Sequence, residues 1–221
     1  MHENFTSQQA LLLIECQNEW LNPKGKLHHL MQHKEQFESS LRNIELALRH
    51  ARAQGLSIIH SGLRFQAGYP ELTGGKAGLR EAIPRVGTFP EDSWNSQFYP
   101  SLQPLQGEFV VQGRTGASAF SGSNLDVYLR HKDITEIFIA GYALHVCVES
   151  TLREAHDKGY LPILIEDASA AFTAAQQSHV LDQVVHHFGY SISTEDFKEI
   201  KSHRPLYNEE TLYPSQAHYT I

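Results

Sequence analysis

Short apolar runs alternate along the chain with stretches whose apolar residues recur at helical spacing. Because polar residues rarely interrupt these runs, they are typical of strands that are buried on both faces. The runs cover about residues 9–15, 56–61, 107–112, 135–141, 161–166 and 189–194. Such alternation favours a parallel sheet whose crossover helices cover both faces. The expected fold is therefore α/β, with three α/β/α layers built around a six-stranded parallel sheet.

The stretches between these runs predict helices. In residues 35–54, Phe37 and Ile44 fall on one side of a helix together with other apolar residues. Further helices are expected over about residues 123–132, 146–158 and 174–188. Gly55 and Gly159 each follow a predicted helix and precede a predicted strand, which is the usual place for a left-handed residue that ends a helix.

Two segments lack this regular alternation. Residues 62–106 contain glycines, prolines and aromatic residues without a sustained period, and so long a stretch predicts a functional cover or an interface. Residues 201–221 are expected to be either a disordered end or an arm that packs on another subunit. No internal repeat or linker interrupts the sequence. We therefore expect a single domain over residues 1–221, with a core at about 9–195 and an arm or tail at 196–221.

Composition narrows the function classes. The chain has 221 residues, of which 41% are hydrophobic and 19% charged, and its net charge of −7 argues against a nucleic-acid partner. No apolar run is long enough to cross a bilayer, and no secretory signal is recognised, so a cytoplasmic location without membrane contact is expected. The two cysteines are expected to be free thiols. The 14 histidines are scattered without metal-ligand spacing, so no metal is expected.

Candidate chemistry lies where three of the predicted strands end. The run at 135–141 leads into GYALHVCVES, which places Cys147 at the start of a helix, where the helix dipole should ease loss of the thiol proton. Glu15 ends the first strand, and Arg114 follows the third. If these strands lie side by side, the three residues converge on one crevice at the carboxyl edge of the sheet. A cysteine hydrolase needs such a nucleophile, a proton acceptor and donors for an oxyanion.

At these residues the chain resembles the isochorismatase-like cysteine hydrolases, which include nicotinamidases, carbamoyl-group hydrolases and isochorismatase itself. The first matching segment is LLLIECQNEW (11–20), similar to the family's strand ending in Asp-x-Gln-x-Asp/Glu. The others are GRTGASAFSGSNLDVYLR (113–130), GYALHVCVESTLREAHDKGY (141–160) and LPILIEDASAAF (161–172). The resemblance extends from about residue 9 to residue 195.

The resemblance implies a catalytic triad of Asp, Lys and Cys, of which only Cys147 is kept. Glu15 stands at the Asp position and Arg114 at the Lys position. Since a guanidinium does not give up its proton, Arg114 is expected to be an electrostatic anchor. The resemblance also implies an oxyanion hole formed by the backbone N–H groups of Ala143 and Cys147, with a cis peptide bond between Tyr142 and Ala143. Nicotinamidases add a metal site whose Asp-x-His cluster is absent here, which argues against that branch.

Five further side chains are candidates for substrate binding: Gln17, His145, Tyr142, Trp94 and Phe120. For Gln17, an equally good interpretation is that its amide holds the site together by hydrogen bonds. His145 stands two residues before the nucleophile, where it either contacts substrate or is a solvated loop residue. Trp20 and Trp94 are candidates for a pocket wall, although aromatic residues more often lie in cores or interfaces.

The function expected from these residues and from the resemblance is hydrolysis of a C–N bond in a small amide or carbamoyl-type molecule. The reaction would pass through a thioester on Cys147 and would need no organic cofactor. Two alternatives stay open. One is hydrolysis of an isochorismate-like vinyl ether by carboxylate acid catalysis without a thiol, and the other is a scaffold or binding protein that has lost turnover. The aromatic-rich cover and tail suggest a homodimer or homotetramer.

Overall fold

The fold is built on a parallel sheet, as the sequence predicts. The computed structural model describes residues 8–72 and 74–200. The strands are β1 (Gln8–Ile14), β2 (Ser57–Ser61), β3 (Phe109–Val110), β4 (Ile134–Tyr142), β5 (Leu161–Ala170) and β6 (Tyr190–Ile192). They form a 6-stranded sheet in the order β3-β2-β1-β4-β5-β6, and every neighbouring pair is parallel. The carboxyl ends of all six strands therefore meet at one edge.

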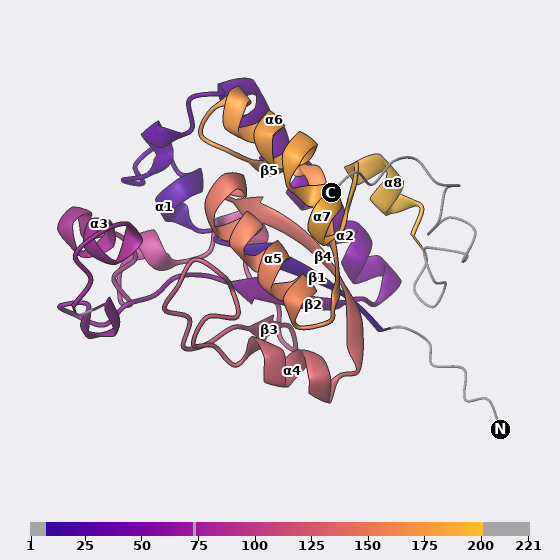
Figure 1. The fold of residues 1–221 in the computed structure, drawn as a ribbon, viewed down its shortest axis with the longest axis horizontal. Helices are drawn as coiled ribbons and strands as arrows, with labels where there is room; N and C mark the ends of the chain where they lie inside the picture. Colours follow the sequence, from indigo (N-terminus) through magenta and orange to yellow (C-terminus); the bar gives the residue numbers. More distant parts are fainter. Residues whose placement is uncertain (1–7, 73, 201–221) are drawn as a thin grey trace.

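Helices cover both faces of this sheet and give the predicted three layers (Figure 1). The helices are α1 (Asn18–Leu21), α2 (Lys34–Gln54), α3 (Leu79–Val86), α4 (Leu125–His131), α5 (Glu149–Asp157), α6 (Ala174–Gln183), α7 (Val185–Phe188) and α8 (Thr194–Lys198). Helices α2 and α8 pack against one face of the sheet, and α4 and α5 pack against the other. Gly55 takes a left-handed conformation with φ 73° and ends α2, as predicted.

Strand β1 explains why the apolar runs are uninterrupted. Leu11 and Leu13 point into the core beneath α2, whereas Leu12 and Ile14 point into the core beneath α4 and α5. All four side chains are fully buried, because both faces of the strand are covered. Burial of each contributes roughly 1.5–3 kcal/mol. This anchoring fixes the position of the residues that follow the strand.

The observed boundaries depart from the predicted ones in several places. Strand β3 has only two residues, and the helix predicted over 174–188 is two helices separated at Val184, whose φ is −118°. The folded core extends past residue 195, because Phe197 of α8 is fully buried against α2 and β5. Residues 201–221, where an arm or tail is expected, lie outside the described residues.

The segment 62–106 contains more regular structure than its sequence suggests. It includes α3, together with the 3₁₀ turns η2 (Pro70–Leu72), η3 (Trp94–Ser96) and η4 (Pro100–Leu102). Helix α3 lies between Gly78 and Gly87, both with positive φ, and its short length and internal Pro84 hide the helical period. No helix within residues 8–72 and 74–200 has the length and apolar character needed to span a membrane.

Candidate active site

Glu15, Arg114 and Cys147 meet at the carboxyl edge of the sheet. Nη2 of Arg114 lies 2.6 Å from Oε1 of Glu15, and both side chains are only 1% exposed. Cys147 lies close enough to both side chains for Glu15 and Arg114 to act on the pKa of its thiol. The predicted convergence thus occurs, but not through three adjacent strands. Strand β2 lies between β1 and β3, and Arg114 reaches across its last residue, Ser61, to meet Glu15.

Glu15 follows β1 directly and has an unusual backbone conformation. Its φ is 50°, in the left-handed region that non-glycine residues rarely occupy. Its N–H donates to the Ser61 carbonyl at 2.8 Å, which holds this turn against the end of β2. The carboxylate accepts from Arg114 on one oxygen and from the Trp20 indole N–H at 2.9 Å on the other. Both oxygens of the buried acid are therefore positioned by specific donors.

Arg114 is held on every side. Its Nε donates to the Gly116 carbonyl at 3.1 Å, and its Nη1 donates to both the carbonyl and the hydroxyl of Ser61 at 3.4 Å. Its Nη2 is shared between the Ala117 carbonyl and Glu15. Only one guanidinium nitrogen contacts the carboxylate, so the ion pair is not bidentate. Because a guanidinium has five N–H donors, these contacts use its full capacity and fix the charge in place.

Cys147 lies in the π-helical turn η5 (Leu144–Val148), which leads into α5. Burial raises the pKa of the Cys147 thiol well above its ordinary value; the carboxylate of Glu15 raises it further, and Arg114 opposes this change. Burial therefore opposes the easier deprotonation that is expected at a helix start. The Cys147 N–H already donates to the Ala143 carbonyl at 3.1 Å, and the side chain is removed from water. Such a thiol needs a base that takes its proton during attack.

The backbone around Ala143 has the special geometry that the resemblance implies. The Tyr142–Ala143 peptide bond is cis. The Ala143 carbonyl accepts from the N–H groups of Val146, Cys147 and Val148. The Ala143 N–H has no acceptor within the described part of the chain, so it is available to a ligand. The role of the Ala143 and Cys147 amides as an oxyanion hole stays a prediction.

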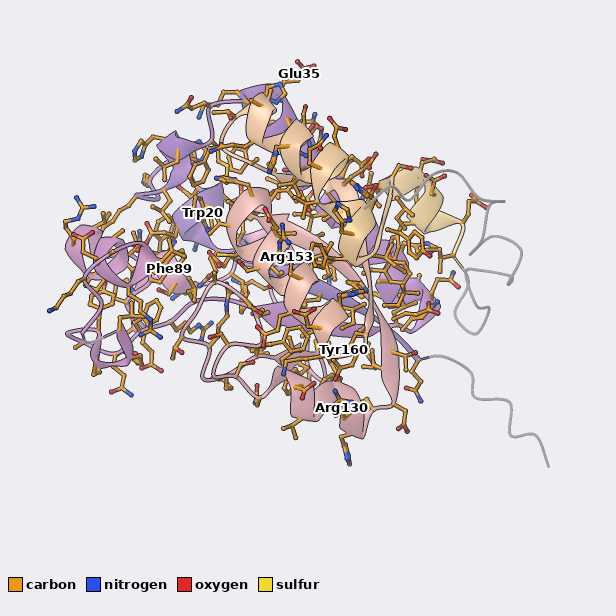
Figure 2. The ribbon with its side chains drawn as sticks, viewed as in Figure 1. Trp20, Glu35, Phe89, Arg130, Arg153 and Tyr160 are labelled. Atoms are coloured by element: carbon orange, nitrogen blue, oxygen red, sulfur yellow. The ribbon has the colours of Figure 1, made fainter. Side chains whose placement is uncertain are left out.

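A pocket of about 220 Å³ opens beside the nucleophile. Glu15 and Cys147 both line it, and aromatic side chains form part of its wall. Trp20 and Phe89 lie side by side in this wall, with ring centroids 6.5 Å apart (Figure 2). Phe172 packs on the other side of Trp20, at 5.9 Å. The 62–106 segment contributes α3 to the lining, in agreement with its expected role as a cover.

Gln17 and Tyr142 do not line this pocket. Nε2 of Gln17 donates to the carbonyls of Leu63 and Ser96 at 2.8 and 2.7 Å, and its Oε1 accepts from the Leu63 N–H at 2.9 Å. Gln17 therefore ties the end of β1 to the cover. Tyr142 is fully buried with its hydroxyl 2.9 Å from Ser40 of α2. Its side chain is enclosed in the core and not open to the pocket, so the structure does not support the expected substrate contact.

Three other candidates also lie outside the pocket lining. Trp94 is 42% exposed on the surface, whereas Phe120 is buried and stacks on Tyr160 at 5.8 Å. Neither is placed to contact a substrate at Cys147, so both expectations are corrected. His145 is half-buried with its ring 4.5 Å from that of Phe172, and burial lowers its pKa. His145 therefore packs against Phe172, which is a residue of the pocket wall.

Several important residues were missed or underrated by sequence reasoning. Trp20 was considered only as a general wall residue, although it hydrogen-bonds Glu15. Its position five residues after the acid, in a short helix, was the available signal. Ser61 acts through its backbone as well as its hydroxyl, and no sequence pattern indicates this. Within residues 8–72 and 74–200, no three His, Cys, Asp or Glu side chains gather in a way that could hold a metal ion.

Known proteins match the part of the chain that contains these site residues. The sequence model of the isochorismatase domain matches residues 9–196. Ureidoacrylate amidohydrolase RutB from Variovorax paradoxus (strain S110) is 28% identical over 203 residues, which cover 86% of this chain and 80% of that protein. The solved structure of a cysteine hydrolase from Pseudomonas syringae pv. phaseolicola has a TM-score of 0.75 at 22% identity, covering 86% of this chain and 91% of the other.

N-carbamoylsarcosine amidase from Thermoplasma acidophilum is a further structural neighbour, with a TM-score of 0.66 and 19% identity. It covers 85% of this chain, and 97% of its own chain is matched. These two structural similarities support the α/β fold. The domain match spans the strands and turns that position Glu15, Arg114 and Cys147. The chain therefore belongs to the isochorismatase family.

Proposed function

We propose that the protein is a cysteine hydrolase that cleaves the C–N bond of a small amide or carbamoyl-type substrate. The observation that carries this proposal is that Cys147 and Glu15 line the same pocket, with the Glu15 carboxylate near enough to act on the pKa of the thiol. A nucleophile within reach of a carboxylate base is the arrangement that acyl transfer requires. The names of two similar proteins, ureidoacrylate amidohydrolase and N-carbamoylsarcosine amidase, support the same bond type.

The reaction begins when the Cys147 sulfur attacks the carbonyl carbon and Glu15 takes the thiol proton. The electron pair of the C=O bond moves to oxygen, where the Ala143 N–H, which is free within the described part of the chain, is a candidate donor. The Cys147 N–H would join it by turning from the Ala143 carbonyl to the substrate oxygen. When the tetrahedral intermediate collapses, the C–N bond breaks and Glu15 returns the proton to the leaving nitrogen. The products at this stage are a free amine or ammonia and a thioester on Cys147.

A water molecule then attacks the thioester carbonyl while Glu15 accepts one of its protons. The second tetrahedral intermediate expels the Cys147 sulfur, which regains the proton from Glu15. The acid product leaves, and the enzyme returns to its starting state. No electron carrier takes part, because no atom changes oxidation state.

In this mechanism, Glu15 and Arg114 have different roles. Glu15 moves the proton, and Arg114 supplies a fixed positive charge beside both Glu15 and the thiol. The charge of Arg114 opposes the effect of burial on the Cys147 pKa, so it stabilises the thiolate as it forms. Arg114 does not exchange a proton at any step.

The test uses Cys147→Ala, with Cys16→Ala as the matched control. Both cysteines are buried and free, but Cys16 lies in the core and does not line the pocket. We expect Cys147→Ala to lower amide and ureido hydrolysis at least about 10³-fold, whereas Cys16→Ala keeps it. Ammonia release gives the rate, and mass spectrometry of acid-quenched protein detects the acyl group on Cys147.

The outcomes separate the alternatives. Activity on an isochorismate-like vinyl ether that survives Cys147→Ala and is lost in Glu15→Gln would select the thiol-independent reaction. A scaffold protein would show no turnover, and a small thiol reagent would label Cys147 as slowly as Cys16. For a hydrolase, we expect faster labelling of Cys147, because Glu15 beside it can take the thiol proton, whereas Cys16 is enclosed in the core.

A further inference from the structure

We propose that the substrate of this site carries an uncharged, apolar substituent, such as a short alkyl chain or a phenyl group, that packs against α3. The inference rests on the proposed hydrolysis, and it concerns the part of the substrate away from the scissile bond. It comes from the chemistry of the pocket wall, which differs sharply from that of its catalytic corner.

The polar groups of the pocket are confined to one corner. Apart from Glu15, Cys147 and Thr88, every side chain in the lining is apolar. Helix α3 supplies one whole wall through Leu79, Ala82, Ile83 and Val86. A wall of this kind stabilises apolar groups by removing them from water, and it offers no hydrogen bond to a polar substituent.

No positive charge in the lining is available to a substrate carboxylate. None of the described residues that line the pocket is Lys, Arg or His. Arg114 lies behind Glu15, and its donors are committed to Glu15, Ser61 and two loop carbonyls. Lys26 comes near the rim, but its Nζ donates to the carbonyls at the end of α3. A carboxylate bound here would lose water without gaining a partner, and it would face Glu15, which has the same sign.

The apolar surface also extends to the mouth of the pocket. Leu79 and Val86 are 41% and 45% exposed, although both line the pocket. A second hollow of about 290 Å³ also lies against α3 and shares Leu63, Leu79 and Ile83 with the first. Exposed apolar residues gathered around a mouth often mark a binding site for an apolar group.

The first experiment compares matched amides. Straight-chain primary amides from acetamide to hexanamide lengthen the acyl side, and N-alkyl ureas of equal length extend the leaving side. We expect kcat/KM to rise about fourfold for each added methylene in one of the series, which is about 200-fold from acetamide to hexanamide. Adipic acid monoamide is hexanamide with its terminal methyl group replaced by a carboxylate. It should be hydrolysed at least about 100-fold less efficiently than hexanamide.

The second experiment adds the missing charge. Val86→Arg places a cation at the mouth, at a half-exposed position where the substitution should not disturb folding. We expect the ratio of kcat/KM for adipic acid monoamide over hexanamide to rise roughly tenfold. Val127→Arg is the matched control, because Val127 is 72% exposed on α4, away from the pocket, and should leave this ratio unchanged (Figure 1).

Binding to Cys147→Ala separates failure of this inference from failure of the hydrolase proposal. Trp20 lines the pocket, so quenching of its fluorescence reports occupancy. Tighter binding of hexanamide than of adipic acid monoamide supports the apolar site even if no amide is cleaved, and only the hydrolysis then fails. Preference for the carboxylate compound in binding or in kcat/KM overturns the inference, and so do flat responses in both series.

Discussion

The buried ion pair between Glu15 and Arg114 allows a quantitative test of how the site is held. Both side chains are 1% exposed, and their nearest atoms lie 2.6 Å apart. Removing one partner of such a pair leaves an uncompensated buried charge, which costs about 3–5 kcal/mol of unfolding free energy. We therefore expect a loss in this range for Arg114→Met. Glu15→Gln is expected to destabilise through the same effect, because the guanidinium is left without its counter-charge.

The double variant removes both charges and should be more stable than the sum of the single losses predicts. We expect a coupling free energy of about 2–4 kcal/mol between Glu15 and Arg114. The carbonyls that Arg114 also contacts lose their donor in Arg114→Met and in the double variant alike. The free energy of leaving these carbonyls unpaired therefore cancels in the cycle. Urea unfolding followed by tryptophan fluorescence gives the four free energies needed.

The control cycle uses Arg130 and Asp126 on the surface of α4. Their closest atoms lie 3.3 Å apart, and the side chains are 59% and 32% exposed. A pair of this kind couples by only about 0.3–0.5 kcal/mol. A coupling below about 1 kcal/mol between Glu15 and Arg114, no larger than that of the surface pair, would refute the interpretation that the two charges hold each other.

Two further predictions concern stability. Burial acts to raise the pKa of Glu108, but hydrogen bonds from Arg52, the Leu105 N–H and His60 outweigh it and bring the pKa to about 2. The resulting stabilisation is present above the ordinary value of 4.5 and is lost as pH falls toward 2, so the advantage of wild type over Glu108→Gln should shrink by about 2 kcal/mol across this range in urea titrations. Gln17→Ala should lower the free energy of unfolding by about 3 kcal/mol, because it leaves three buried backbone groups unpaired. An unchanged urea midpoint would contradict the interpretation that Gln17 clamps the end of β1 to the segment 62–106.

The sheet was predictable because its strands are buried on both faces. Leu11 to Ile14 alternate between two cores, so the run is apolar throughout and reads as a strand. The carboxyl edge then places Glu15 and Cys147 in the same region. The first and third strands are not neighbours, and the sequence left their adjacency open because strand order depends on crossovers that local sequence does not reveal. Arg114 still reaches Glu15, because its long side chain spans the end of β2, which lies between the two strands.

The pocket wall was much less predictable. Nearness in sequence suggested Tyr142 and Phe120, yet Tyr142 is buried against Ser40 of α2 and Phe120 is enclosed in the core beneath α4 and α5. The actual wall comes largely from α3, which contacts the site only through tertiary packing. Backbone groups such as the Ser61 carbonyl are invisible to residue patterns. Likewise, the sequence could not show that burial dominates the pKa of the Cys147 thiol.

The clamp formed by Gln17 bears on how relatives of this protein could be recombined. One side-chain amide joins the strand that bears the acid to two points of the segment that shapes the pocket, at Leu63 and Ser96. A transplanted segment would therefore need to present two carbonyls and one N–H at the same places. Exchange of this segment between such enzymes should preserve folding when the transplanted segment keeps these three backbone groups in place. It should fail when a junction of the exchange displaces one of them.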